Sequence, residues 1–252
     1  MIEVQDACKR YGAYVAVDQA SIEIRERRIT SLIGPNGAGK STLLSMASRL
    51  IPLDRGKVQI DGVELHRWKD RDLAQKISIL KQTNHLALRL TVRDLVGFGR
   101  FPYSQGRLTR ADIEQVDRAI ETMNLEALHG KYLDELSGGE RQRAFIAMVI
   151  AQDTDYILLD EPLNNLDMKH SVQIMKALRR LVDELDKTVV LVLHDINFAS
   201  CYSDDIVAMK GGRVIKAGPA CDIIDSGVLR EVYDMEIQVQ EFNCQRVCVY
   251  FN

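Results

Sequence analysis

A glycine-rich stretch near the N-terminus has the residue types that bind phosphate. It consists of Gly34, Pro35, Asn36, Gly37, Ala38, Gly39, Lys40 and Ser41, followed by Thr42. Its glycines let successive backbone N–H groups point inward at an anion, because no Cβ atom blocks that conformation. The Lys40 ammonium can then reach the β- and γ-phosphates of a nucleotide, and the Ser41 hydroxyl can ligate Mg²⁺. A merely flexible glycine-rich turn would not need this Lys-Ser ending, so we predict a phosphate-binding loop.

Two adjacent acidic residues follow an apolar run later in the chain. Residues 156–159 read Tyr-Ile-Leu-Leu, and Asp160 and Glu161 come next. An acid at the carboxyl end of a buried strand can hold Mg²⁺ through its water shell. The next residue points in a different direction and can act as a general base on an attacking water. Many strands end in an acid, but downstream of a phosphate-binding loop the pair predicts Asp160 as a metal ligand and Glu161 as the catalytic base.

A third stretch, residues 136–142, reads Leu-Ser-Gly-Gly-Glu-Arg-Gln. Ser137 is a favoured N-cap residue, and Gly138 and Gly139 allow close approach at the start of a helix that continues to Ala151. The positive end of such a helix could bind phosphate groups. A plain helix cap explains the same residues about as well, so these residues alone leave both interpretations open.

The elements that must position these residues alternate between strands and helices. Apolar, β-branched runs predict strands at residues 29–33, 57–60, 156–159, 189–193, 206–209 and 214–216, and a short strand pair within 236–251. A helix is expected from the phosphate loop to Leu50. Residues 88–150 have helical periodicity, and a second helical stripe follows. The first helical pattern is a Thr109–Asp112 capping box followed by apolar residues on one helix face, Ile113, Val116, Ile120 and Met123. The second helical stripe consists of Val172, Met175, Leu178, Val182 and Leu185. Continuous apolar strands between helices predict an α/β fold with a parallel-rich sheet and a helical subdomain inserted at about residues 88–150.

Composition excludes several classes of protein. The 252 residues are 46% hydrophobic with a net charge of −3, which favours a globular fold over a membrane protein or a generally basic nucleic-acid binder. No apolar run approaches the roughly 18 residues that span a bilayer. The N-terminus lacks a signal-peptide pattern, so we expect a protein that stays in the cytoplasm. The five cysteines are scattered, and we expect Cys244 and Cys248 to form a thiol pair on one face of a strand rather than a metal site.

The phosphate loop, Leu-Ser-Gly-Gly and Asp-Glu, in this order, resemble the motifs of an ATP-binding cassette (ABC) ATPase over nearly the whole chain. The resemblance implies one ABC ATPase domain over residues 1–252, with a P-loop NTPase core, an antiparallel β region at the N-terminus, and ATP and Mg²⁺ as cofactors. Four further positions resemble residues of family motifs. Tyr11 resembles the aromatic residue that stacks on adenine, and Gln82 resembles the glutamine that senses Mg²⁺ and faces the membrane partner. Asp167 resembles the aspartate of the D-loop, and His194 resembles the histidine that contacts the γ-phosphate.

In this family the resemblance implies a head-to-tail homodimer, or two paired cassettes, with two ATP molecules sandwiched between them. Ser137, Gly138 and Gly139 would then serve the nucleotide that the partner's phosphate loop holds. The implied catalytic set is Glu161, His194 and Gln82, and the implied metal set is Ser41, Gln82 and Asp160.

A narrower resemblance concerns the cargo. Residues 96–103, 144–148 and 193–197 resemble cassettes of the iron-siderophore and vitamin B12 importers, and residues 162–167 resemble the ferric-siderophore branch. This implies an ATP-hydrolysing subunit, peripheral on the cytoplasmic face of the inner membrane, that powers import through a separate membrane permease. A substrate-binding protein outside the membrane is an indirect partner, and nucleic acid is not one. Glu140 and Lys81 depart from the glutamine and proline that are commoner there.

We expect the permease to dock on residues 82–103, with Phe98, Phe101 and Tyr103 as apolar anchors and Arg100 as a charged contact. The alternative is that the three aromatic side chains pack in the core of the helical subdomain. Vitamin B12, haem or another metal chelate is the alternative cargo. A chromosome or DNA-repair ATPase would carry a long coiled-coil insertion, whereas Lys40 and Asp160 are only 120 residues apart. A translation factor would carry two cassettes, and a non-hydrolysing regulator would not need Glu161 and His194.

Overall fold

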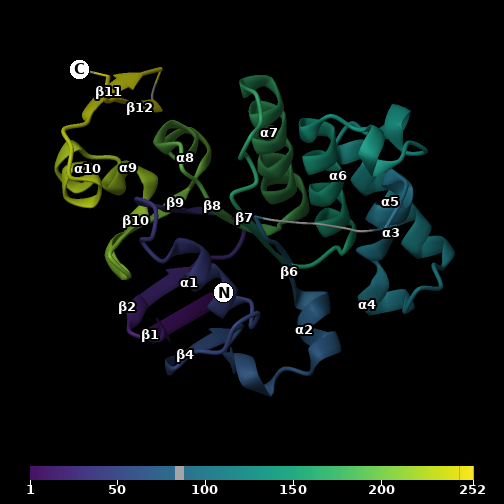
Figure 1. Cartoon of the computed structure of the whole chain (residues 1–252), viewed down its shortest axis with the longest axis horizontal. Coiled ribbons are helices and arrows are strands. Elements are labelled where there is room, and N and C mark those ends of the chain that lie inside the picture. Colours follow the sequence, from purple (N-terminus) through teal and green to yellow (C-terminus); the bar gives the residue numbers. More distant parts are fainter. Residues whose placement is uncertain (83–87, 244, 252) are drawn as a thin grey trace. The chain divides into compact units, whose positions relative to one another are not determined.

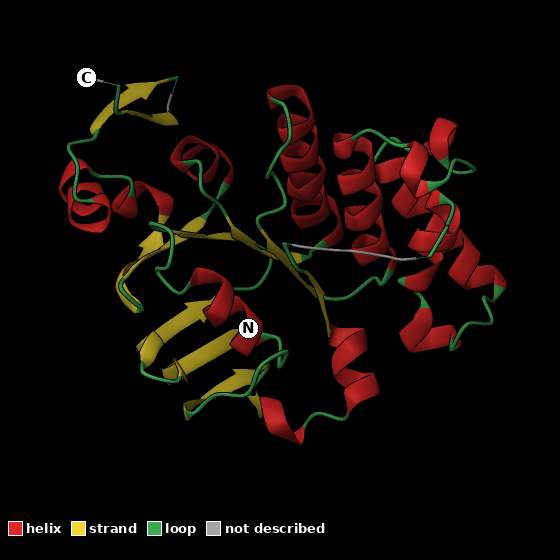
Figure 2. Cartoon of the chain, in the orientation of Figure 1, coloured by secondary structure: helices red, strands yellow, loops and turns green. Residues whose placement is uncertain are grey.

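The computed structural model describes residues 1–82, 88–243 and 245–251. The chain divides into two compact units, one formed by Met1–Trp68 with Thr188–Asn252 and the other by Lys69–Lys187. Both units combine strands with helices, as Figures 1 and 2 show. The residues expected to form a helical insertion, about 88–150, lie within the second unit.

The first unit begins with an antiparallel sheet of strand order β2-β1-β4-β5. Its strands are β1 (Ile2–Tyr11), β2 (Tyr14–Ile24), β4 (Arg55–Ile60) and β5 (Val63–Glu64). Inward-facing side chains of β1, such as Ile2 and Val4, are buried and alternate with more exposed ones, as expected for a half-buried sheet. This sheet is the antiparallel N-terminal region that the family resemblance implies.

The first unit also contains parallel strands with fully buried side chains. Strand β3 (Ile29–Ile33) pairs in parallel with β8 (Thr188–Val192) on one side and β9 (Asp205–Lys210) on the other, and β10 (Arg213–Pro219) runs antiparallel to β9. The remaining elements are η1 (Leu65–Arg67), α1 (Lys40–Ala47), α8 (Ile196–Tyr202), α9 (Ala220–Ile223), α10 (Ser226–Tyr233) and the hairpin of β11 (Gln238–Phe242) with β12 (Gln245–Val249). Helix α1 ends three residues before the predicted Leu50.

The second unit has two parallel strands, β6 (Ile77–Leu80) and β7 (Tyr156–Asp160), and is otherwise largely helical. Its helices are α2 (Asp70–Lys76), α3 (Val92–Phe98), α4 (Phe101–Ser104), α5 (Arg110–Thr122), η2 (Glu126–Leu128), η3 (Leu133–Glu135), α6 (Gly138–Ala151) and α7 (Met168–Leu185). The predicted capping box at the start of α5 is present, because Thr109 accepts from the Asp112 N–H and Asp112 accepts from the Thr109 N–H. The α/β fold class is confirmed, and the predicted strands are all found.

Two residues of the predicted helical stripes are not buried. Ile113 is 40% exposed and Leu185 is 58% exposed, although both fit the helical stripes. On α5 the buried place beside Val116 belongs instead to Asp112, which is 4% exposed. A carboxylate is stable there because a buried arginine pairs with it, and a hydropathy pattern does not register such a pair.

That arginine is Arg100, and its burial corrects the expected docking surface. Arg100 is 7% exposed, and its guanidinium donates to the Asp112 carboxylate at 2.9 Å and to the Ala151 carbonyl at 2.9 Å. The Tyr103 ring lies 3.8 Å from the guanidinium carbon. Burial opposes ionisation of Asp112, but hydrogen bonds from Thr109 and Arg100 prevail and lower its pKa. Arg100 therefore joins α4, α5 and α6 inside the second unit and is not an exposed contact for a partner.

Replacing Arg100 with glutamate is expected to lower the free energy of unfolding by about 3–5 kcal/mol, since it leaves Asp112 as an uncompensated buried charge. Chemical denaturation of the purified protein measures this. Arg93 is a matched control, because its 2.7 Å ion pair with Asp117 is exposed. Arg93→Glu should cost about 1 kcal/mol or less. Equal losses in both variants would contradict a structural role for the buried pair.

Candidate functional site

The predicted phosphate loop connects β3 to α1 in the first unit. The Lys40 side chain is 5% exposed, and its ammonium donates to the carbonyl oxygens of Gly34 at 2.7 Å and Pro35 at 3.0 Å. The chain from residue 34 to residue 40 thus curls around a buried positive charge. A loop of this kind, ending at the positive end of a helix, attracts an anion.

Glycine is required at two points of this loop by close backbone contacts. Gly39 has φ +97°, and a Cβ atom there would lie 2.4 Å from the Ala16 carbonyl oxygen. A Cβ atom at Gly34 would lie 2.0 Å from the Met209 carbonyl oxygen. The loop is further held by the Tyr14 hydroxyl, which donates to the Gly37 carbonyl at 3.0 Å. Sequence reasoning missed Tyr14, because nothing near it in the chain indicates that contact.

Two other predicted residues lie in the first unit. Tyr11 ends β1, and its ring is 51% exposed. His194 follows β8 and is exposed. Directly after it, Asp195 caps α8 by accepting from the N–H groups of Asn197 at 2.7 Å and Phe198 at 3.2 Å. The capped helix begins two residues after His194, so His194 lies in the short turn between β8 and α8.

The predicted catalytic carboxylate lies in the second unit, directly after β7. Asp160 is the buried last residue of that strand, and Glu161 follows with φ +52°, a left-handed conformation that is unusual for glutamate. The Gln82 amide donates to Glu161 Oε2 at 2.5 Å, and the Asn164 amide donates to the same oxygen. Strain of this type concentrates at functional sites. The structure brings Gln82 and Glu161 into contact, a pairing that the sequence did not predict, and adds Asn164 to it.

The Leu-Ser-Gly-Gly stretch starts α6 in the second unit. Ser137 is the N-cap, and its hydroxyl and N–H both donate to Glu140 Oε2 at 2.8 Å. These hydrogen bonds lower the pKa of Glu140. Ser137 and Gly138 are exposed, and a Cβ atom added at Gly138 would meet no atom within 4 Å. Among the residues that the structure describes, no atom near Gly138 demands a glycine.

The predicted D-loop residue Asp167 caps α7. Its carboxylate accepts from the backbone N–H of His170 at 2.8 Å and contacts the His170 ring nitrogen Nδ1 at 2.9 Å. The backbone hydrogen bond, followed by the imidazole contact, lowers the pKa of Asp167. The predicted site residues are thus divided between the two units. The first unit contains Tyr11, residues 34–42 and His194, and the second contains Gln82, Ser137, Gly138, Gly139, Asp160, Glu161 and Asp167.

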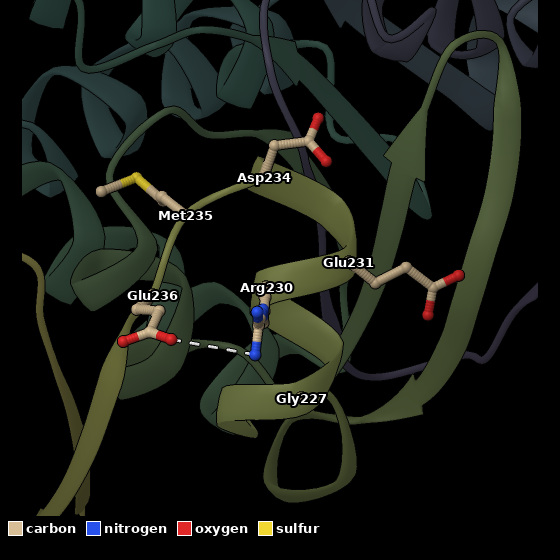
Figure 3. A pocket seen from close by; sticks show the side chains of 6 residues that line it. All are labelled: Gly227, Arg230, Glu231, Asp234, Met235 and Glu236. Atoms are coloured by element: carbon tan, nitrogen blue, oxygen red, sulfur yellow. Dashed lines mark ion pairs between the residues drawn. The ribbon is translucent and has the colours of Figure 1, made fainter.

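Other features do not form part of this site. Figure 3 shows a pocket at α10 lined by Gly227, Arg230, Glu231, Asp234, Met235 and Glu236, none of which carries a predicted role. Arg230 and Glu236 form an ion pair of 3.8 Å there. Burial raises the pKa of Cys248 to about 11, while Cys244, its expected neighbour, lies outside the described residues. Within residues 1–82, 88–243 and 245–251, no three His, Cys, Asp or Glu side chains group as metal ligands. None of the helices in these ranges combines the length and apolarity needed to span a bilayer.

Comparison with known proteins places these observations in a family. Residues 17–164 match the ABC transporter family. The chain is 60% identical to the petrobactin import ATP-binding protein YclP of Bacillus subtilis (strain 168), over 100% of both chains. It is 48% identical to the petrobactin import ATP-binding protein FatE of Bacillus anthracis, over 99% of this chain and 100% of that one. A dimeric, post-hydrolysis ATP-binding cassette bound to ADP and phosphate shares 30% identity, with a TM-score of 0.78, over 87% of this chain and 99% of that one.

The chain therefore belongs to the ABC transporter family. Within that family it is an ATPase subunit, and it lies in the branch that siderophore-import relatives form. The predicted family, fold and enzyme class are confirmed.

Proposed function

We propose that the chain hydrolyses ATP to drive import of an iron–petrobactin complex through a separate membrane permease. The observation that carries the cargo assignment is the relationship to the two petrobactin import proteins, which extends over essentially the full length of each chain. Vitamin B12 or haem as cargo has no comparable support. As a peripheral subunit, the chain would act on the cytoplasmic side of the membrane, and the cargo would reach the permease from an external binding protein.

The residues proposed for the ATP site are those that the family resemblance implies. Tyr11 offers an exposed ring for the adenine, and the phosphate loop offers backbone N–H groups with Lys40 for the phosphates. The two carbonyl oxygens that now hold the ammonium would yield to phosphate oxygens, which carry full negative charge. In the role that the family resemblance implies, the hydroxyl of Ser41, the carboxylate of Asp160 and the amide of Gln82 would supply oxygen ligands of the kind that suits Mg²⁺. The ion would neutralise charge that develops on the phosphates.

Glu161 is the proposed general base. The amides of Gln82 and Asn164 both donate to its Oε2, so the carboxylate plane is held before water arrives. A preoriented carboxylate can accept the proton as the water attacks the γ-phosphate. His194, exposed at the end of β8, is the proposed contact to the γ-phosphate.

Dimerisation would complete each site. Ser137, Gly138 and Gly139 lie at the start of α6, a helix of 14 residues whose positive end can face the partner's nucleotide. The exposure of Ser137 and Gly138 supports this role, as does the empty space around Gly138.

Gly138→Ala tests the sandwich. Among the described residues the added methyl group meets no atom within 4 Å, and alanine restricts the unfolded chain, so stability should stay equal or rise by about 0.4–1 kcal/mol. Against a partner's nucleotide the methyl group should disturb the contact and lower ATP turnover roughly 10- to 100-fold. ATP affinity of the single subunit should not change. Full turnover by this variant would mean that Gly138 does not face a nucleotide.

The permease is expected to dock on the second unit beside Gln82. Phe98 is 48% exposed and Phe101 is 59% exposed, so both are available as apolar anchors. Tyr103 is half-buried and packs against the Arg100 guanidinium, so less of its ring is available to a partner. Residues 83–87 of the expected docking segment lie outside the described residues.

Uptake by cells tests the cargo. Cells that lack their own copy of this subunit but keep its permease should regain uptake of labelled iron supplied as ferric petrobactin when they express the chain. A ferric hydroxamate serves as the control cargo, and the Glu161→Gln chain as the inactive control. Restored uptake of the hydroxamate without petrobactin would reject the cargo assignment while leaving the ATPase assignment intact.

A further inference from the structure

The imidazole of His170 packs against the second glycine of the Leu-Ser-Gly-Gly stretch. A Cβ atom added at Gly139 would lie 3.1 Å from both Cγ and Nδ1 of His170 and 3.3 Å from its Cδ2. These distances are shorter than ordinary van der Waals contact, so the ring occupies the place of a Gly139 side chain. The neighbouring Gly138 has open space at the same point. The two glycines are therefore needed for different reasons.

The same imidazole also contacts the D-loop residue Asp167. Its Nδ1 lies 2.9 Å from Asp167 Oδ1, and the His170 backbone N–H donates to that oxygen at 2.8 Å. The side chain is only 25% exposed. An imidazole is a rigid plane, and with a hydrogen bond at one edge and a glycine against it, its orientation is determined. Both contacts lie within the second unit.

We propose that His170 is a positioning residue, which sets the distance between the start of α6 and the D-loop. The inference rests on the proposed function, in which Ser137–Gly139 face the partner's nucleotide. The ring touches no nucleotide itself. It acts as a spacer, so that the positive end of α6 and the Asp167 carboxylate move together when two subunits close. Catalytic hydrogen bonds depend steeply on such placement, because displacements near 1 Å can cost about 100-fold in rate.

His170→Ala removes the spacer and the imidazole contact to Asp167. We expect kcat to fall about 10- to 100-fold, with no change in the ATP affinity of the single subunit, which lacks the partner's α6. The matched control is His129→Ala, an exposed histidine of the same unit whose ring contacts only the Glu126 carbonyl among the contacts described. Its kcat should be unchanged. A kcat for His170→Ala equal to that of the wild type would overturn the proposal.

Two further variants separate the ring from its hydrogen bond. His170→Phe keeps an aromatic plane against Gly139 but cannot donate to Asp167. His170→Asn keeps a donor near the position of Nδ1 and loses most of the ring. A spacer role predicts that phenylalanine restores more of the kcat than asparagine does. The reverse order would show that capping of α7 matters and that the spacing does not.

A compensating pair tests the contact directly. Gly139→Ala should lower kcat, because its methyl group pushes against the ring. Gly139→Ala combined with His170→Ala should recover part of that loss, since the methyl group enters space that the ring has left. Simple multiplication of the two single losses would contradict the contact as the origin of the effect. Thermal unfolding of each variant checks that the folded fraction is the same.

Gly138→Ala keeps this test distinct from a test of the proposed function. If Gly138→Ala loses turnover while His170→Ala keeps it, the sandwich stands and only the spacer role fails. If Gly138→Ala keeps full turnover, Ser137–Gly139 do not face a nucleotide, and both proposals fail.

Discussion

Replacing Glu161 with glutamine is expected to slow ATP hydrolysis by roughly 10²–10⁴-fold, the range that a general base contributes. The amide is nearly isosteric with the carboxylate, and its oxygen can still accept from Gln82 and Asn164, which both donate to Glu161 Oε2. The local geometry is therefore retained, while the ability to take a proton from water is lost. Binding of ATP should be unaffected, because no phosphate contact is removed.

The measurement is steady-state phosphate release, together with ATP affinity. Because hydrolysis reopens the dimer in the proposed cycle, the ATP-bound dimer of Glu161→Gln should accumulate and elute earlier in size-exclusion chromatography. Glu114→Gln is a matched control, since Glu114 is a surface residue of the same unit that pairs with Arg110 at 3.4 Å. Its rate should equal that of the wild type. Wild-type turnover in Glu161→Gln would assign the base to another residue.

Replacing Lys40 with alanine is expected to weaken ATP binding roughly 10- to 150-fold, which corresponds to the 1.5–3 kcal/mol of a hydrogen bond to a charged group. The ammonium is the buried charge at the centre of the loop, held by the Gly34 and Pro35 carbonyl oxygens at 2.7 and 3.0 Å. It provides positive charge for the β- and γ-phosphates in a place where little water screens it. Calorimetric titration with ATP measures the change.

The control for this substitution must separate lost charge from a lost loop conformation. Lys40→Met keeps most of the length of the side chain without the charge, so it should bind ATP as weakly as Lys40→Ala. Unfolding in the absence of nucleotide shows whether the loop still folds. If ATP affinity is unchanged in both variants, residues 34–41 are not the phosphate site.

Much of this protein follows from short segments of its sequence. The run Ile29–Ile33 forms a buried strand, and the glycines that follow form the loop around Lys40. Capping boxes form where they were expected, at Thr109 with Asp112, since both partners lie within one helical turn and contact each other whatever the rest of the chain does. The strand, the loop and the capping box depend on local interactions, so residue type and separation are enough to predict them. The family came from the resemblance of the ordered motifs to those of ABC ATPases.

The tertiary structure alone decided which distant side chains meet. Gln82 and Glu161 are 79 positions apart and share a hydrogen bond. Asp112 is buried on α5 whereas the apolar Ile113 beside it is exposed, because Arg100, the N-cap of α4, pairs with the Asp112 carboxylate. His170 lies against Gly139, which is 31 positions away in the chain. The sequence predicts Gly139 only as part of a helix start, whereas in the structure an imidazole also packs against it. Such pairings depend on how helices and strands pack, and the free energy that selects them comes from burial and pairing of groups that no local pattern connects.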